Sequence, residues 1–196
     1  MVGKFLLNSS NDPTDWWTDR MTSVEALLSK SDNLVTHAVI PFQFGYDAGG
    51  RADVVQFREY VPGVVYATSE LIGDDRPMQN ALGNYGLAIC HRTDEAWGAQ
   101  TISSLAYYTL DARLEPGQTM DIGRAVPARS TISAFLFGQF GRFTVRGRKA
   151  GLLLCIGITS DELTACRWGN CQRVEAGLGS KGVYPFTDFT RRSVLK

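Results

Sequence analysis

The run from Gly151 to Ile158 is the feature that most constrains how this chain can fold. The five residues from Leu152 to Ile156 are all apolar. A strand with this pattern is buried on both of its faces. At eight residues, the run is also far shorter than the ~20 apolar residues that a helix needs to cross a bilayer. We therefore predict an inner strand here and no membrane span.

Seven further segments are predicted to form strands, because they are rich in β-branched or aromatic residues and are bounded by glycine, proline or aspartate. They are Leu34 to Phe44, Val54 to Tyr60, Val64 to Ser69, Tyr85 to His91, Thr131 to Phe137, Phe143 to Arg146 and Val183 to Phe189. In the fourth of these, large residues alternate with the small residues Gly86, Ala88 and Cys90. This alternation favours a sheet with helices packed on it over a sandwich of two sheets.

Four segments have apolar residues at helical spacing. The first follows Asp12 and has one apolar stripe, made of Trp17, Met21, Val24 and Leu28. The others are Gly98 to Arg113, Asp161 to Arg167, and a short helix after Asn170 that places Val174 and Leu178 inward. Thr159 and Glu162 have the spacing of a capping box in front of the third helix.

Strands and helices mix irregularly along the chain, which predicts an α+β fold. The length of 196 residues predicts one domain, residues 1–196. Twenty lysines and arginines balance twenty aspartates and glutamates, and the isoelectric point is near 6.7, so the chain lacks the basic surface of a dedicated nucleic-acid binder. The segment from Met1 to Asn11 has no long apolar stretch, so we predict no secretory signal and a cytoplasmic protein.

The four cysteines are predicted to be reduced thiols. Cys90 and Cys155 lie in apolar strand segments and are interpreted as small core residues. Cys166 and Cys171 have no histidine or second cysteine pair nearby to complete a structural zinc site, so we predict no bound metal. Cys90 and His91 cannot meet as nucleophile and base, because successive strand residues point to opposite faces.

Acidic residues gather at two predicted strand ends. One cluster is Glu70, Asp74 and Asp75, and the other is Asp94 and Glu95. Paired carboxylates can act as acid and base or hold a divalent cation. Acidic residues are also common in turns, which is the interpretation that we favour. The alternative hypothesis for function is thus a hydrolase or metal-dependent enzyme that uses Asp74 and Asp75, with His91 as an additional candidate.

Positive charge gathers in the segment between Ile122 and Ser160, which contains no aspartate or glutamate. Arg142, Arg146 and Arg148 belong to a predicted hairpin with its turn near Gly147. These charges could steer an acidic partner. Alternatively they form a solvated hairpin that protects a sheet edge from mispairing, which is the interpretation that we favour.

Five segments, in this order, resemble the suppressor of fused (SUFU) family. They are Gly63 to Asp74, Tyr85 to Cys90, Ile102 to Tyr108, Leu152 to Leu163 and Val183 to Val194. The resemblance covers Tyr60 to Val194, whereas the first thirty residues are only weakly covered. It implies a central mixed, mostly antiparallel sheet with packed helices, no catalytic activity, no cofactor and a protein partner. The chain looks like a bacterial single-domain member.

The resemblance also implies site residues. Tyr66 and Asp74 align with positions near a peptide groove of the animal protein, and Glu70 and Asp75 lie beside them in the sequence. Bacterial members resemble immunity proteins that neutralise polymorphic toxins, so a cognate toxin is the expected partner, and a chaperone-like binder of extended peptides is a further alternative. Asp188 and Arg191 belong to the family's terminal motif, where Arg191 either pairs with Asp188 to fix the chain or binds a partner's carboxylate; we favour the structural role.

Overall fold

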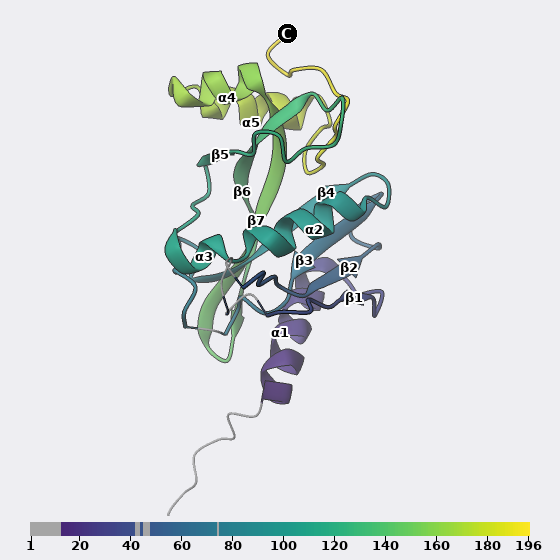
Figure 1. The fold of residues 1–196 in the computed structure, drawn as a ribbon, viewed down its shortest axis with the longest axis vertical. Coiled ribbons are helices and arrows are strands. Elements are labelled where there is room, and N and C mark those ends of the chain that lie inside the picture. Colours follow the sequence, from purple (N-terminus) through teal and green to yellow (C-terminus); the bar gives the residue numbers. More distant parts are fainter. Residues whose placement is uncertain (1–12, 42–43, 45–47, 74) are drawn as a thin grey trace, which may run out of the picture.

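The computed structural model describes residues 13–41, 44, 48–73 and 75–196 of the chain (Figure 1). Its centre is a seven-stranded sheet with the order β1-β2-β3-β4-β7-β6-β5. The strands are β1 (Val35–Thr36), β2 (Val54–Phe57), β3 (Val64–Thr68), β4 (Asn84–His91), β5 (Thr119–Asp121), β6 (Ile132–Val145) and β7 (Arg148–Thr159). Neighbouring strands are antiparallel except for β4 and β7, which are parallel. The predicted α+β class with a mixed, mostly antiparallel sheet is confirmed.

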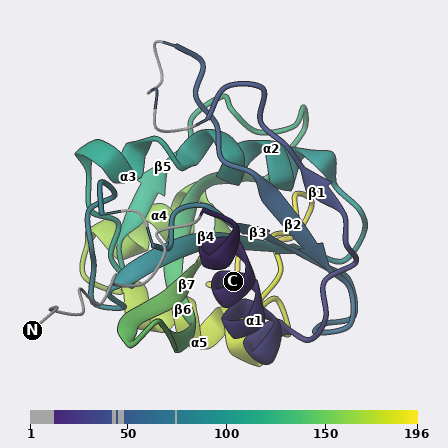
Figure 2. The same ribbon diagram turned by 90° about the horizontal axis from the view of Figure 1, so that it is seen from below.

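Helices cover both faces of this sheet. They are α1 (Pro13–Leu28), α2 (Ala96–Leu105), α3 (Tyr108–Asp111), α4 (Ser160–Arg167) and α5 (Cys171–Ser180). Figure 2 shows α2 on one side of the sheet and α1 and α5 on the other. Among the residues with described placement, no helix is long and apolar enough to span a membrane.

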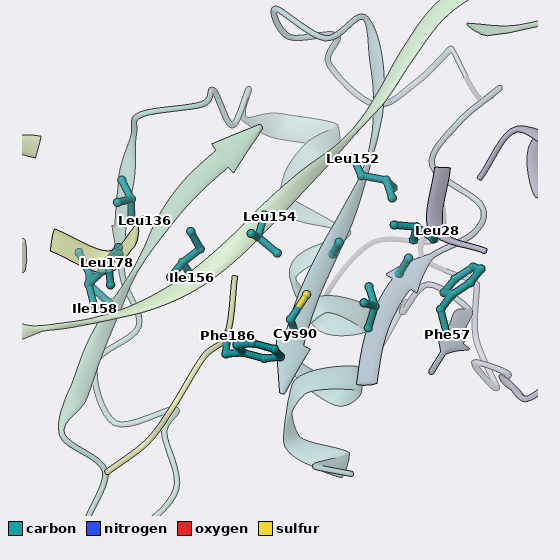
Figure 3. Packing of buried hydrophobic residues seen from close by; sticks show 14 of the residues in the cluster. Leu28, Phe57, Cys90, Leu136, Leu152, Leu154, Ile156, Ile158, Leu178 and Phe186 are labelled. Carbon is teal, nitrogen blue, oxygen red and sulfur yellow. The ribbon is translucent and has the colours of Figure 1, made fainter. Parts of the chain in front are cut away.

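Strand β7 supplies side chains to the cores on both faces, as its uniformly apolar sequence predicts. Leu152, Leu154 and Ile156 pack in the core that α1, α4 and α5 cover (Figure 3). Leu153 and Cys155 pack in the core beneath α2. Because the strand is buried on both sides, a polar side chain at any of these positions would be shielded from water and would lose its hydrogen bonds to it.

The capping box predicted at the start of α4 is present. The main-chain nitrogen of Thr159 donates to Glu162 Oε2 at 2.9 Å, and the Thr159 side chain accepts from the helix in return. Helix α5 also follows the sequence prediction, since it begins directly after Asn170 and buries Val174 and Leu178. The predicted helix from Gly98 to Arg113 is instead divided into α2 and α3.

Two strand predictions are wrong. Within Leu34 to Phe44, where residues 42–43 lie outside the description, only Val35–Thr36 pairs as a strand. Val183 to Phe189 forms a single bridge, between Phe186 and Cys90. Pro185 has no N–H to donate to a ladder, which explains why this apolar segment does not continue as a strand. The predicted strands Thr131 to Phe137 and Phe143 to Arg146 are parts of one continuous strand, β6. Strand β5 was not predicted.

The prediction of four reduced thiols is also wrong. Cys166 and Cys171 form a disulfide, with their Cα atoms 4.0 Å apart. The turn between α4 and α5 brings them together, because Cys166 lies in the last turn of α4 and Cys171 is the first residue of α5. Cys90 and Cys155 are free and buried, as predicted for core residues.

Candidate functional site

The predicted basic hairpin and the predicted acidic cluster meet at one end of the molecule. Arg148 Nη1 donates to Asp75 Oδ1 at 2.8 Å, although the two residues are far apart in the sequence. Arg146 Nε donates to Asp19 Oδ2 at 2.5 Å. Both guanidinium groups face the ring of Trp16, at 4.4 Å from its centroid for Arg146 and 6.0 Å for Arg148. We call Trp16, Asp19, Asp75, Arg146 and Arg148 the hairpin surface.

Trp16 anchors this surface to the fold. Its ring packs against the small core of Ile72, Val145 and Ala150. Gly73 lies directly beneath the ring, since a Cβ atom built there would be 2.6 Å from a ring carbon. Gly73 also has φ +95°, which favours glycine. The sequence does not reveal these contacts of Trp16, because they join α1 to the hairpin and to Gly73, which lie far away along the chain.

Arg142 does not belong to the hairpin surface. It lies on β6, is exposed, and donates from Nε to Gln139 Oε1 at 2.9 Å. Asp74 lies outside the described residues, so the structure gives no position for it.

Glu70 is partly buried, and it serves the fold. Its Oε2 accepts a hydrogen bond from the main-chain nitrogen of Asp53 at 3.2 Å. Burial raises the pKa of the Glu70 carboxyl above its ordinary value. The main-chain oxygens of Glu70 and Ile72 both accept from Arg20 Nη1, which fixes the loop that leads to Asp75.

Tyr66 is buried, with a relative exposure of 1%. Its hydroxyl donates to Asp94 Oδ1, and Arg58 bridges Asp94 and Asp32 at 2.5 Å and 2.7 Å. Burial, followed by the contact with Asp94, raises the pKa of Tyr66. Tyr66 therefore orients Asp94 from beneath, and Asp94 and Arg58 are the most exposed members of this network.

The structure does not bring together the residues of the alternative enzyme hypothesis. Asp75 pairs with Arg148, the first residue of β7. Two residues further on, Ala150 is in register with Asn84, the first residue of β4. His91 is the last residue of β4. At 3.3 Å per residue, the two ends of this strand are roughly 23 Å apart. Within the described part of the chain, no group of three or more His, Cys, Asp or Glu side chains could hold a metal ion.

His91 is buried beneath α2. Its Nδ1 lies 2.9 Å from the main-chain oxygen of Thr187, and its Nε2 is buried with no hydrogen-bond partner. Gly98 leaves room for the ring, because a Cβ atom there would be 2.4 Å from Nε2. Burial lowers the pKa of His91 below its ordinary value.

The predicted pairing of Arg191 with Asp188 is not observed. Both Arg191 terminal nitrogens instead donate to Glu162, at 2.7 Å and 2.5 Å. Asp188 Oδ1 accepts from the main-chain nitrogen and the hydroxyl of Thr190. Burial acts to raise the pKa of Glu162, but hydrogen bonds from Arg191, Val194 and Thr159 outweigh it and hold the pKa below its ordinary value. The capping-box spacing was the only local signal of Glu162, and it does not reveal Arg191.

The fold is α+β, with charged networks both on the surface, at Trp16, and in the interior, at Glu162. Comparison with known proteins identifies the fold. A SUFU homologue from Neisseria gonorrhoeae FA 1090 matches with a TM-score of 0.66 and 16% identity, over 92% of this chain and 97% of that chain. The structure of a Sufu–Fu complex matches with a TM-score of 0.65 and 15% identity, over 93% and 91%. Drosophila Suppressor of Fused matches with a TM-score of 0.58 and 16% identity, over 76% of this chain and 45% of that chain.

The sequence comparison gives the family. The family model described as Suppressor of fused protein (SUFU) matches residues 67–192. A comparison with curated protein sequences gave no match. The chain belongs to the suppressor of fused family, which confirms the resemblance found in the sequence.

Proposed function

We propose that this chain is a non-catalytic protein-interaction module and that its hairpin surface contacts the partner. The observation that carries the proposal is the meeting of three separate segments around Trp16, each contributing an exposed or partly exposed charge. Figure 1 shows the hairpin of β6 and β7 and the helix α1 at the same end of the molecule.

The ion pairs of this surface are suited to exchange with a partner. In the pair of Arg148 and Asp75, the side chains are 53% and 73% exposed. Exposed ion pairs contribute only ~0–1 kcal/mol to stability, so a partner can replace one member at little cost. Tryptophan and arginine are also the residues that most often dominate binding at interfaces.

Family membership supports a protein partner. The Sufu–Fu complex is a structure of a similar fold bound to another protein. For this chain we propose a cognate toxin as the partner, met in the cytoplasm and neutralised by binding through complementary charge. No observation in the structure favours the alternative enzyme, because Asp75 and His91 lie at opposite ends of β4.

The test is a charge exchange within the hairpin surface. In the Asp75→Arg, Arg148→Asp double variant, the internal ion pair can still form, whereas the pattern shown to a partner is reversed. A matched control is Asp121→Arg with Arg167→Asp, because these residues form an exposed ion pair elsewhere. Tagged wild type, exchange variant and control are used to capture partners from the source cells, and bound proteins are identified by mass spectrometry.

We expect one stoichiometric partner that wild type and control retain and the exchange variant loses. Retention by the exchange variant would show that the hairpin surface is not the binding site. Absence of any stoichiometric partner would contradict the interaction module. The toxin proposal is tested by co-expressing the captured partner: wild type should restore growth of cells that the partner arrests, and a partner without toxicity would refute it.

A further inference from the structure

A cavity of about 450 Å³ lies at the end of the molecule opposite the hairpin surface. It is formed by the end of β4, the end of α5 and the C-terminal segment, which Figure 1 shows beside α5 at the top of the view. Its volume is within the range of ~300–1,000 Å³ that is typical of sites for small molecules. The residues that line it are Arg92, Lys181, Gly182, Val183, Phe186, Asp188, Arg191, Arg192, Ser193, Val194 and Lys196.

The rim of the cavity carries uncompensated positive charge. Arg92, Lys181 and Arg192 are exposed, and none of them forms an ion pair with an aspartate or glutamate side chain in the described ranges. Arg92 Nη2 donates to the main-chain oxygen of Gly182 at 2.7 Å, and Lys181 Nζ donates to that of Lys196 at 2.5 Å. Each therefore keeps N–H groups for a ligand, since arginine has five and lysine three.

Asp188 is the one acidic side chain among the residues that line the cavity, against several cationic side chains. Asp188 Oδ1 accepts two hydrogen bonds from Thr190. The second charged pair at the wall, Arg191 with Glu162, is internally neutral. The lining therefore has an excess of positive charge after these pairs are counted.

The wall contains a buried donor without an acceptor. The side chain of Arg191 is only 5% exposed, and its terminal nitrogens are held by Glu162 and by the main-chain oxygens of Gly157 and Arg192. Its Nε atom is buried and has no hydrogen-bond partner. That atom has almost no accessible surface and does not open into the cavity, so the ligand is assigned to the exposed cations of the rim and not to Arg191.

The remaining wall is apolar. Val183, Phe186 and Val194 supply it, and the guanidinium of Arg92 lies 4.2 Å above the centroid of the Phe186 ring. This stacking holds Arg92 at the edge of the cavity, with its charge next to an apolar surface. The arrangement suits a ligand that has an anionic head and a small apolar body.

We propose that this cavity binds a small phosphate monoester. The phosphate is held by Arg92, Lys181 and Arg192, and the apolar body of the ligand contacts Val183 and Phe186. A phosphate monoester carries a charge of about −1.5 to −2 and three acceptor oxygens, which matches three cations better than a single carboxylate does. Arginine is well suited to such oxygens, because its planar fork donates two parallel hydrogen bonds.

The test uses phenyl phosphate as the probe, titrated into the whole chain and followed by calorimetry and by NMR amide shifts. We expect saturable 1:1 binding in the millimolar range or tighter, with shifts centred on residues 181–194 and Arg92. Benzoate and inorganic phosphate are titrated separately and should bind more weakly, since each lacks one of the two recognised parts.

Two variants locate the site. Arg192→Gln removes the charge of an exposed side chain, and Arg92→Gln with Lys181→Gln removes the other two cations. Each is expected to weaken phenyl phosphate binding by at least about 10-fold, the value of one charge-assisted hydrogen bond. Arg173→Gln is the control, because Arg173 is an exposed cation on α5 that does not line the cavity.

Three results would overturn the proposal. The first is no saturable binding of phenyl phosphate by wild type. The second is equal binding by wild type and the cavity variants, or an equal loss in Arg173→Gln, which would show a general charge effect. The third is benzoate binding as tightly as phenyl phosphate, which would make the cavity a carboxylate site. Circular dichroism of each variant establishes that the fold is retained before binding is compared.

Discussion

The carboxylate of Glu162 accepts hydrogen bonds from both terminal nitrogens of Arg191, and the side chains of both residues are at most 5% exposed. The same carboxylate accepts main-chain hydrogen bonds from Thr159 at 2.9 Å and from Val194 at 2.7 Å. Glu162 therefore joins the end of β7, the start of α4 and the C-terminal segment. The fold depends on this carboxylate because four donors converge on it in a buried place.

Replacement of Glu162 by glutamine should be strongly destabilising. The change leaves the Arg191 guanidinium buried without a counter-charge, and loss of one partner of a buried pair costs about 3–5 kcal/mol. Urea unfolding followed by tryptophan fluorescence measures the loss. The control is Glu175→Gln, the same chemical change at an exposed position of α5. Equal losses in the two variants would contradict the role assigned to Glu162.

Removal of both charges should cost less than the two single changes together. In Glu162→Gln with Arg191→Met, no uncompensated charge remains. The amide oxygen of the glutamine can still accept from the main-chain nitrogens of Thr159 and Val194. We expect a coupling energy of at least about 1 kcal/mol in a double-mutant cycle, because the residues are in direct contact. Additive losses would mean that the pair contributes no specific interaction.

The free energy of unfolding should fall as the pH is lowered below about 6.5, where His91 becomes protonated in the unfolded chain but stays neutral in the folded protein. Burial lowers the pKa of His91 from its ordinary 6.5, so the unfolded state binds more protons than the folded state below about that pH. The contribution is complete above 6.5 and is lost as the pH falls toward the folded-state pKa. Urea unfolding between pH ~7.5 and ~5.5 measures the slope.

The variant His91→Asn identifies the source of this slope. Its amide can still donate to the main-chain oxygen of Thr187, but it does not titrate. We expect a free energy of unfolding that depends less on pH than that of wild type. An unchanged slope would assign the pH dependence to other groups.

Thiol labelling should distinguish two pairs of cysteines. In denaturant without reductant, Cys90 and Cys155 are expected to react, whereas Cys166 and Cys171 should react only after reduction. In the folded protein, Cys90 and Cys155 should resist labelling, because burial raises the pKa of both thiols. Loss of the disulfide in Cys166→Ser with Cys171→Ser should cost about 2 kcal/mol, as expected for a short loop. Four reactive thiols before reduction, counted by mass spectrometry, would contradict the disulfide.

Gly73→Ala should disturb the anchor of the hairpin surface. An added Cβ would combine backbone strain at φ +95° with a contact of 2.6 Å to Trp16. Gly117→Ala is the matched control, since Gly117 has φ +86° and open space around it. We expect a loss of about 1–2 kcal/mol from strain in the control and roughly 1–3 kcal/mol more in Gly73→Ala. A similar loss in both variants would show that Trp16 moves aside freely.

Local sequence patterns predicted the elements whose stability is local. The apolar run at Leu152 to Ile156 predicted a doubly buried strand, and the spacing of Thr159 and Glu162 predicted the helix start. In both cases neighbouring residues decide the structure. The segment from Val183 to Phe189 has a composition typical of a strand, but Pro185 has no N–H to donate and the segment forms a single bridge, between Phe186 and Cys90.

Contacts between distant segments could not be predicted in this way. Asp75 and Arg148 are 73 residues apart, and Glu162 and Arg191 are 29 apart. The charge of each residue indicates the sign of its partner but does not identify the residue that becomes the partner. Burial of Tyr66 beneath Asp94 likewise depends on where β3 lies in the sheet. The assignment of a single domain to residues 1–196 stays a prediction.

Thr187 has a consequence for synthesis of the chain on the ribosome. Its amide donates to the main-chain oxygen of Cys90, and its hydroxyl accepts from Gly157 and donates to Cys155. One residue thus fastens the parallel strands β4 and β7, which were both translated earlier. Protection of the ends of these two strands from proteases should therefore be complete only after Thr187 has emerged from the exit tunnel.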